Sequence, residues 1–160
     1  MSKTQSRIGV TITENTLIPN IYFSSAGSQT FADVAGTYKV NFAEGGVSIS
    51  NNSQSLINTD IPNDAFVALL RNTKWLISIS GAISTSTGAG ELFGIGLYKN
   101  NTLISPSYTT VTMDANTNQY NFSKTLIVDL LPTTILDFRV TKEAGDVILG
   151  RLNITLIQVG

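Results

Sequence analysis

Residues 91–105, which read ELFGIGLYKNNTLIS, decide the fold class of this chain. Apolar side chains alternate at Phe93, Ile95 and Leu97, and a glycine stands at each position between them. This period of two is typical of a β-strand. Asn100-Asn101 then interrupts the pattern with residues that favour tight turns. The stretch therefore predicts a hairpin whose first strand has one apolar face and one face of very small residues.

The same alternation recurs in four further stretches, at residues 74–80, 124–131, 135–140 and 151–160. In each, the apolar side chains share one strand face and predict a core-facing surface. These side chains are Trp75, Ile77, Ile79, Leu126, Val128, Leu130, Leu136, Phe138, Val140, Leu152, Ile154 and Leu156. Turn-forming residues separate the runs at short intervals, as at Gly45-Gly46, Pro132-Thr133 and Gly145-Asp146. Many short strands at this spacing indicate an all-β sandwich or barrel.

One stretch leaves an alternative open. Residues 62–72, PNDAFVALLRN, could begin a helix capped by Asn63 or Asp64, with Phe66 and Leu69 on one face. A strand pattern follows directly, so an extended edge strand is favoured over a helical turn.

The composition fits a single domain. The chain has 160 residues, 42% of them apolar and only 13% charged, with a net charge of −1. This length supports one compact core rather than two. We expect an N-terminal arm over residues 1–20 and one β-sandwich over residues 21–160. The only basic bias is at Lys3 and Arg7, which are candidates for anchoring the arm. Without a clustered basic face, we expect no nucleic-acid partner.

The chain contains no histidine and no cysteine. The common catalytic constellations, in which one of these residues acts as base or nucleophile, are therefore excluded. Transition-metal sites also lose their usual ligands. The acidic residues form no dense cluster, so we expect a protein that is not an enzyme and holds no cofactor or metal.

The most metal-like stretch begins at Asp114, where Asp114, Asn116 and Asn118 imitate the first ligands of a calcium loop. The glycine and the chelating glutamate that such a loop needs are replaced by Gln119 and Thr125. The stretch therefore predicts a polar loop. We expect this loop and the turn at Asn100 and Asn101 to face outward.

No membrane partner is expected either. The first ten residues have no apolar run typical of an export signal. The longest apolar stretch, residues 125–138, is interrupted by Asp129, Pro132 and Asp137, so it predicts no spanning helix.

Residues 66–160 resemble the globular head of the C1q and tumour-necrosis-factor (TNF) superfamily. The segment LLRNTKWLISISGAI at 69–83 resembles the family's turn followed by an aromatic strand, with Trp75 at the aromatic position. FGIGLYKNNTLIS at 93–105 resembles its central hairpin. KTLIVDLLPTTILDFRVTKEAGDVILG and RLNITLIQVG resemble its last strands, with Pro132-Thr133 where the family usually has Gly-Asp.

The resemblance implies an antiparallel jelly-roll sandwich that assembles as a homotrimer. The strand at 93–98 carries little charge on either face, so a partner on each face is favoured. Leu92, Gly94, Gly96 and Tyr98 are the candidate subunit-contact face. A monomer with a thick core is the alternative.

Two classes of function fit these observations. The first is a virion structural protein at the virion surface: a capsid decoration, spike or fibre head whose arm docks on a capsid or other virion protein. The second is an extracellular or cell-surface module that binds a receptor or glycan. In that case Tyr98, Tyr108 or Tyr120 could stack on a sugar.

Overall fold

The structure is a computed structural model of the chain. It describes residues 18–25, 28–31, 35–42, 47–52, 56–60, 63–69, 72–85, 91–113, 119–143 and 145–160. Residues 1–17 lie outside this part, and Lys3 and Arg7 with them. The division into an arm and a sandwich domain therefore stays a prediction.

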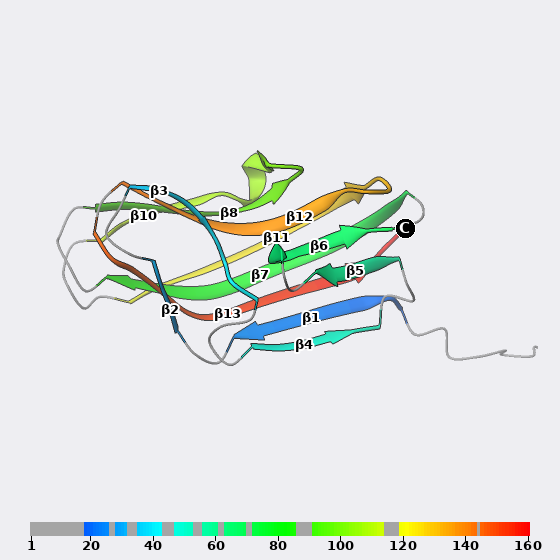
Figure 1. The fold of residues 1–160 in the computed structure, drawn as a ribbon, viewed down its shortest axis with the longest axis horizontal. Helices are drawn as coiled ribbons and strands as arrows, with labels where there is room; N and C mark the ends of the chain where they lie inside the picture. Colours follow the sequence, from blue (N-terminus) through cyan, green and yellow to red (C-terminus); the bar gives the residue numbers. More distant parts are fainter. Residues whose placement is uncertain are drawn as a thin grey trace, which may run out of the picture.

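The described strands form two antiparallel sheets (Figure 1). Sheet I has six strands and sheet II has seven. In sheet I the order is β11 (Tyr120–Leu130), β7 (Thr73–Thr85), β13 (Val147–Gln158), β1 (Asn20–Ser25) and β4 (Val47–Asn51), and β2 (Ser28–Phe31) also pairs with β13.

Sheet II has the order β10 (Thr109–Met113), β8 (Glu91–Lys99), β12 (Ile135–Lys142), β6 (Ala65–Ala68) and β5 (Ile57–Asp60). In addition, β3 (Gly36–Lys39) pairs with β12, and β9 (Thr102–Leu103) pairs with β8. A short 3-10 turn, η2 (Ser105–Ser107), follows β9.

Strands from the two ends of the described chain pair with each other. β1 lies beside β13, which lies beside β7 in turn (Figure 1). The prediction of an all-β, antiparallel sandwich is confirmed. Residues 65–68 are extended as β6, so the ambiguous segment forms a strand as favoured, but β6 lies between β12 and β5 and not at the edge of the sheet.

The core lies between the sheets and uses the predicted faces. Trp75, Ile77 and Ile79 of β7 are buried, and so are Leu136, Phe138 and Val140 of β12. Aromatic rings connect the two sheets: the rings of Phe122 (β11) and Phe138 (β12) are stacked, with their centroids 6.5 Å apart. Because alternate residues point to opposite sheet faces, the apolar period of two is sufficient to set this orientation.

Among the described residues, no helix is long and apolar enough to cross a membrane.

Candidate functional site

The turn Asn100-Asn101 is exposed, and its side chains bond within the chain. Both residues have positive φ, 48° and 65°, which asparagine tolerates better than most residues. The Asn100 Oδ1 accepts a hydrogen bond from the Ile135 N–H at 2.8 Å, and the Asn101 Oδ1 accepts one from the Arg139 guanidinium at 2.5 Å. Both amide oxygens therefore tie the hairpin to β12, whatever else the turn contacts.

The other predicted outward loop, with Asp114, Asn116 and Asn118, lies outside the described residues. Within the described part of the chain, no three acidic residues come together in a way that could hold a metal ion.

The candidate subunit-contact face on β8 is largely covered by the chain itself. Tyr108, which follows η2, lies against Gly94 so closely that a β-carbon there would come within 2.7 Å of the ring. At Gly96, a β-carbon would come within 2.6 Å of the Leu103 side chain. Because Gly94 and Gly96 have no side chains, the β9–η2 segment of the same chain can pack closely against β8.

The remaining two residues of that face differ from each other. The Tyr98 ring lies under the Arg139 guanidinium, with 4.4 Å from its carbon to the ring centroid. Leu92 is 36% exposed. A role of this face in subunit contacts stays a prediction, and Leu92 is the side chain through which it can be tested.

A charged cluster lies on the same outer side of sheet II. The Asp137 carboxylate is 2% exposed and pairs with Arg139 through both of its oxygens. Lys39 approaches the same carboxylate at 3.4 Å. The hydrogen bonds that the Arg139 guanidinium donates to Asp137 raise the pKa of Arg139 above its ordinary value. A buried carboxylate held in this way serves the fold, since two cations compensate its burial.

The outer face of sheet I, by contrast, is polar and nearly uncharged. Two rows of side chains cross it in register and contain only hydroxyl and amide groups. These rows are Ser123–Ser80–Asn153–Ser24–Ser48 and Thr125–Ser78–Thr155–Tyr22–Ser50. Ser78 bonds to Thr125 within one row at 3.1 Å, and Tyr22 bonds to Asn153 of the other row at 3.2 Å.

The next row on this face is apolar. Ile127, Leu76 and Ile157 stand side by side on β11, β7 and β13. Ile127 is 61% exposed, and the other two are half-buried. We call these three residues the apolar row. An apolar row on the solvent side of a sheet is a candidate protein-contact surface.

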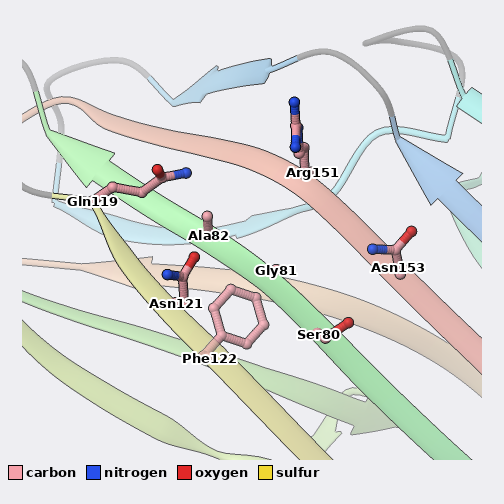
Figure 2. Close-up of a pocket in the computed structure, with 8 residues that line it drawn as sticks. All are labelled: Ser80, Gly81, Ala82, Gln119, Asn121, Phe122, Arg151 and Asn153. Carbon is pink, nitrogen blue, oxygen red and sulfur yellow. The ribbon is translucent and has the colours of Figure 1, made fainter.

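A hollow opens on the same face, farther along β7. It has a volume of about 590 Å³. Figure 2 shows its lining, which comes from three neighbouring strands. The lining residues are Ser80, Gly81, Ala82, Gln119, Asn121, Phe122, Arg151 and Asn153. We call this hollow the bulge groove.

The groove forms beside an irregularity in β13. The pairing of β13 with β7 shifts register between Gly150 and Asn153, and Arg151 has a positive φ of 47°. Such a β-bulge redirects side chains and is common near functional sites. Backbone strain at a non-glycine residue is likewise enriched at such sites.

Sequence reasoning missed this groove, although a signal for it exists. The apolar side chains of the last strand fall on odd positions at Val147 and Leu149 and on even positions from Leu152 onward. A change of phase within one strand indicates an extra residue, which is a bulge. This change of phase does not predict which residues of β7 and β11 line the groove together with Arg151.

Comparisons of the whole fold identify its type. No protein-family model matches the sequence, and no curated protein matches it. Among solved structures, the PRD1 vertex protein P5 aligns over 89% of this chain and 98% of its own, with a TM-score of 0.60 and 8% identity. Eiger TNF from S. frugiperda aligns over 89% and 94%, with a TM-score of 0.62 and 9% identity.

The chain has a TNF-like jelly-roll fold. Murine APRIL aligns similarly, over 87% of this chain and 98% of its own, with a TM-score of 0.58 and 7% identity. At these identities the likeness concerns the fold alone. The resemblance read from the sequence is thereby confirmed, and the TNF-like jelly roll is the scaffold that carries the apolar row and the bulge groove.

Proposed function

We propose that the protein is a non-enzymatic structural component of a virion surface, such as a capsid decoration, spike or fibre head, and that it acts as a homotrimer. Its partners in this role are two further copies of itself and a capsid or other virion protein. The observation that carries the assembly is the apolar row on the outer face of sheet I, beside two rows of uncharged side chains. The likeness of the fold to a phage vertex protein supports the setting.

The subunit contact is proposed on sheet I because association requires little desolvation of charge there. Hydroxyl and amide groups border the apolar row on one side, with hydrogen bonds already formed between neighbouring strands, and the exposed Lys74–Asp129 pair borders it on the other. A stable interface buries about 800 Å² per partner. At about 25 cal/mol per Å² of apolar area, Ile127 and its neighbours would contribute to offsetting the entropy of association.

Light scattering of the purified protein at micromolar concentration tests the trimer. A mass of about 51 kDa, three times 17.1 kDa, is expected. Ile127→Asp introduces a charge into the apolar row and should yield a monomer. Leu92→Asp makes the same kind of change on β8 and is the matched control. A wild-type mass near 17.1 kDa contradicts the trimer. Dissociation by Leu92→Asp alone assigns the contact to the β8 face instead.

Attachment to a shell is proposed at the end where the described chain begins. The Pro19 carbonyl accepts a hydrogen bond from the Gln158 N–H at 2.9 Å, so the start of the described chain lies beside the C-terminal strand. Large apolar side chains are exposed nearby: Ile18 is 61% exposed, Leu131 53% and Val159 50%. Leu131 and Val159 line one hollow of about 520 Å³. Together with residues 1–17, this end offers a docking base.

Co-sedimentation with the shell particles of the source virus tests the docking. The full chain should sediment with the particles, and a variant lacking residues 1–17 should remain in the supernatant with its fold intact by circular dichroism. Equal sedimentation of the two proteins would show that the arm is not needed. Capsid or tail genes beside this gene would support the virion setting.

The second candidate function is a receptor- or glycan-binding module at an extracellular or cell surface. The bulge groove is the observation that favours it, because the groove is polar and open to solvent. The three tyrosines considered for sugar stacking do not line this groove. Tyr98 and Tyr108 pack against Arg139 and Gly94, and Tyr120 is 44% exposed.

A further inference from the structure

We propose that the bulge groove binds a carboxylate-bearing saccharide, with the Arg151 guanidinium pairing with the carboxylate. The proposal rests on the second candidate function and gives it a site and a ligand class. It does not depend on the trimer or on the virion setting, since a surface protein of either kind can bind a sugar.

The charge of the groove selects an anion. Among the described residues that line the groove, Arg151 is the only charged one, and none of them is acidic. Several other cations of the described residues are already engaged: Arg139 pairs with Asp137, and Lys74 lies 3.8 Å from Asp129. Arg151 is exposed and has no ion pair with a described residue. A planar guanidinium in this setting suits a bidentate carboxylate.

A single cation also restricts the kind of anion. Phosphate and sulfate esters are usually held by several cations or by a nest of backbone N–H groups, and nucleic acids by a row of cations. The groove has one guanidinium and otherwise uncharged donors and acceptors. A monoanionic carboxylate on an uncharged, hydroxyl-rich ligand matches this arrangement best.

The remaining polar side chains suit sugar hydroxyls. Asn121, Gln119 and Ser80 offer amide and hydroxyl groups that bond to no described residue. Asn153 accepts from the Tyr22 hydroxyl through its Oδ1, which leaves its amide N–H groups to donate. Amides and hydroxyls both donate and accept, as sugar hydroxyls do. They come from β11, β7 and β13, so they surround the ligand position on more than one side (Figure 2).

The shape of the hollow follows from small residues between these walls. Asn121, Ala82 and Gly150 are register partners across β11, β7 and β13. A β-carbon at Gly150 would meet no atom within 4 Å, so the space above it is open. Ala82 is 4% exposed, so the room for a ring lies over Gly150, with the rows of larger polar side chains beside it.

Two methyl glycosides separate the carboxylate from the rest of the sugar. Methyl β-D-glucuronide carries the carboxylate, and methyl β-D-glucoside has a neutral hydroxymethyl group at the same carbon. Each is titrated into the full chain labelled with 15N, while amide shifts are followed by NMR. The glucuronide should shift the amides of Ala82, Asn121 and Asn153 in a saturable way, and the glucoside should bind at least tenfold more weakly.

Two variants with the same loss of charge assign the effect. Arg151→Asn removes the guanidinium with a residue that tolerates a positive φ, so the bulge is retained. It should lower the glucuronide affinity at least tenfold and leave no preference over the glucoside. Lys74→Gln removes a cation from the same sheet face outside the groove and should leave the affinity unchanged.

Several results would overturn the proposal. These are the absence of saturable shifts with the glucuronide, equal affinity for the two glycosides, shifts centred on another surface, or unchanged affinity in Arg151→Asn. Repeating the titration with Ile127→Asp keeps the two proposals apart. Groove shifts in a monomeric variant support the site by itself, whereas a wild-type monomer that binds the glucuronide contradicts only the trimer.

Discussion

The Tyr108 ring packs directly on Gly94 of β8, and β9 and η2 lie between the two residues in the sequence. The Ser107 hydroxyl holds the turn that positions it, accepting a hydrogen bond from the Leu97 N–H at 2.8 Å and donating one to the Ile104 carbonyl at 2.6 Å. The alternating glycines of β8 are therefore explained by contact within one subunit. The Tyr108 and Leu103 side chains fill the space above the glycines, so the glycines themselves are covered by the same chain.

Gly94→Ala should destabilise the protein by about 1–3 kcal/mol, because the added methyl group overlaps the Tyr108 ring and a β-strand backbone cannot retreat from its ladder. Urea unfolding followed by tryptophan fluorescence measures the change. Gly150→Ala is the control, since a β-carbon there meets nothing within 4 Å. A Gly94→Ala variant within about 0.5 kcal/mol of wild type, the range of ordinary surface substitutions, would contradict the packing.

Asp137→Asn should cost about 3 kcal/mol, because it leaves Arg139 and Lys39 facing an uncharged group in a largely buried setting. Asp129→Asn is the matched control. Its carboxylate is 74% exposed and lies 3.8 Å from Lys74, so its loss should change stability by less than about 1 kcal/mol. Similar effects of the two substitutions on the unfolding midpoint would show that burial of Asp137 contributes nothing.

The contribution of Arg139 to folding stability should not change between neutral and moderately alkaline pH. Its pKa is raised in the folded protein, chiefly by the hydrogen bond with Asp137. A group whose pKa is raised on folding contributes its full stabilisation at pH values below its unfolded-state pKa. This contribution is lost only as the pH rises through its folded-state pKa. For arginine both pKa values lie well above about pH 10. The destabilisation caused by Arg139→Gln should thus be equal at about pH 7 and about pH 10, and a smaller effect at the higher pH would contradict this.

Thr133→Gly should stabilise the protein by roughly 0.5–1 kcal/mol. Thr133 has a φ of 66°, which is unfavourable for a β-branched residue and free for glycine. Its N–H bond to the Ala68 carbonyl, 2.9 Å long, does not involve the side chain and should persist. Thr102→Gly in strand β9 is the control and should destabilise, because it adds backbone freedom without relieving strain. Thermal unfolding distinguishes an increase in Tm from a decrease.

Arg151→Gly should also stabilise, by roughly 0.5–1 kcal/mol, since the bulge at φ 47° no longer carries a β-carbon. The same variant should lose the preference for the glucuronide. Greater stability with lost binding would mean that the arginine is kept for its charge. Lower stability, measured by thermal unfolding beside the Thr133→Gly variant, would indicate that the Arg151 side chain holds the bulge in place.

The period of two in the sequence was enough to predict the sandwich and its core. Trp75, Ile77 and Ile79 are buried as predicted, because successive side chains of a strand point to opposite faces and these three share one face. The turn at Asn100-Asn101 was readable as well, because it depends on the local preference of asparagine for positive φ. Local rules of this kind need no knowledge of which strands become neighbours.

What each face contacts was decided only by the tertiary structure. From the sequence, Gly94 was predicted to belong to a subunit-contact face, whereas in the structure Tyr108 of the same chain lies over it. Asp137 alternates with the buried residues of β12, yet its carboxylate is 2% exposed and pairs with Lys39 of the neighbouring strand β3 and with Arg139 of β12 itself. Arg151 and Asn121 line one groove only because β13 and β11 flank β7. Alternation in sequence determines which way a side chain points, whereas its neighbours depend on pairings between distant strands.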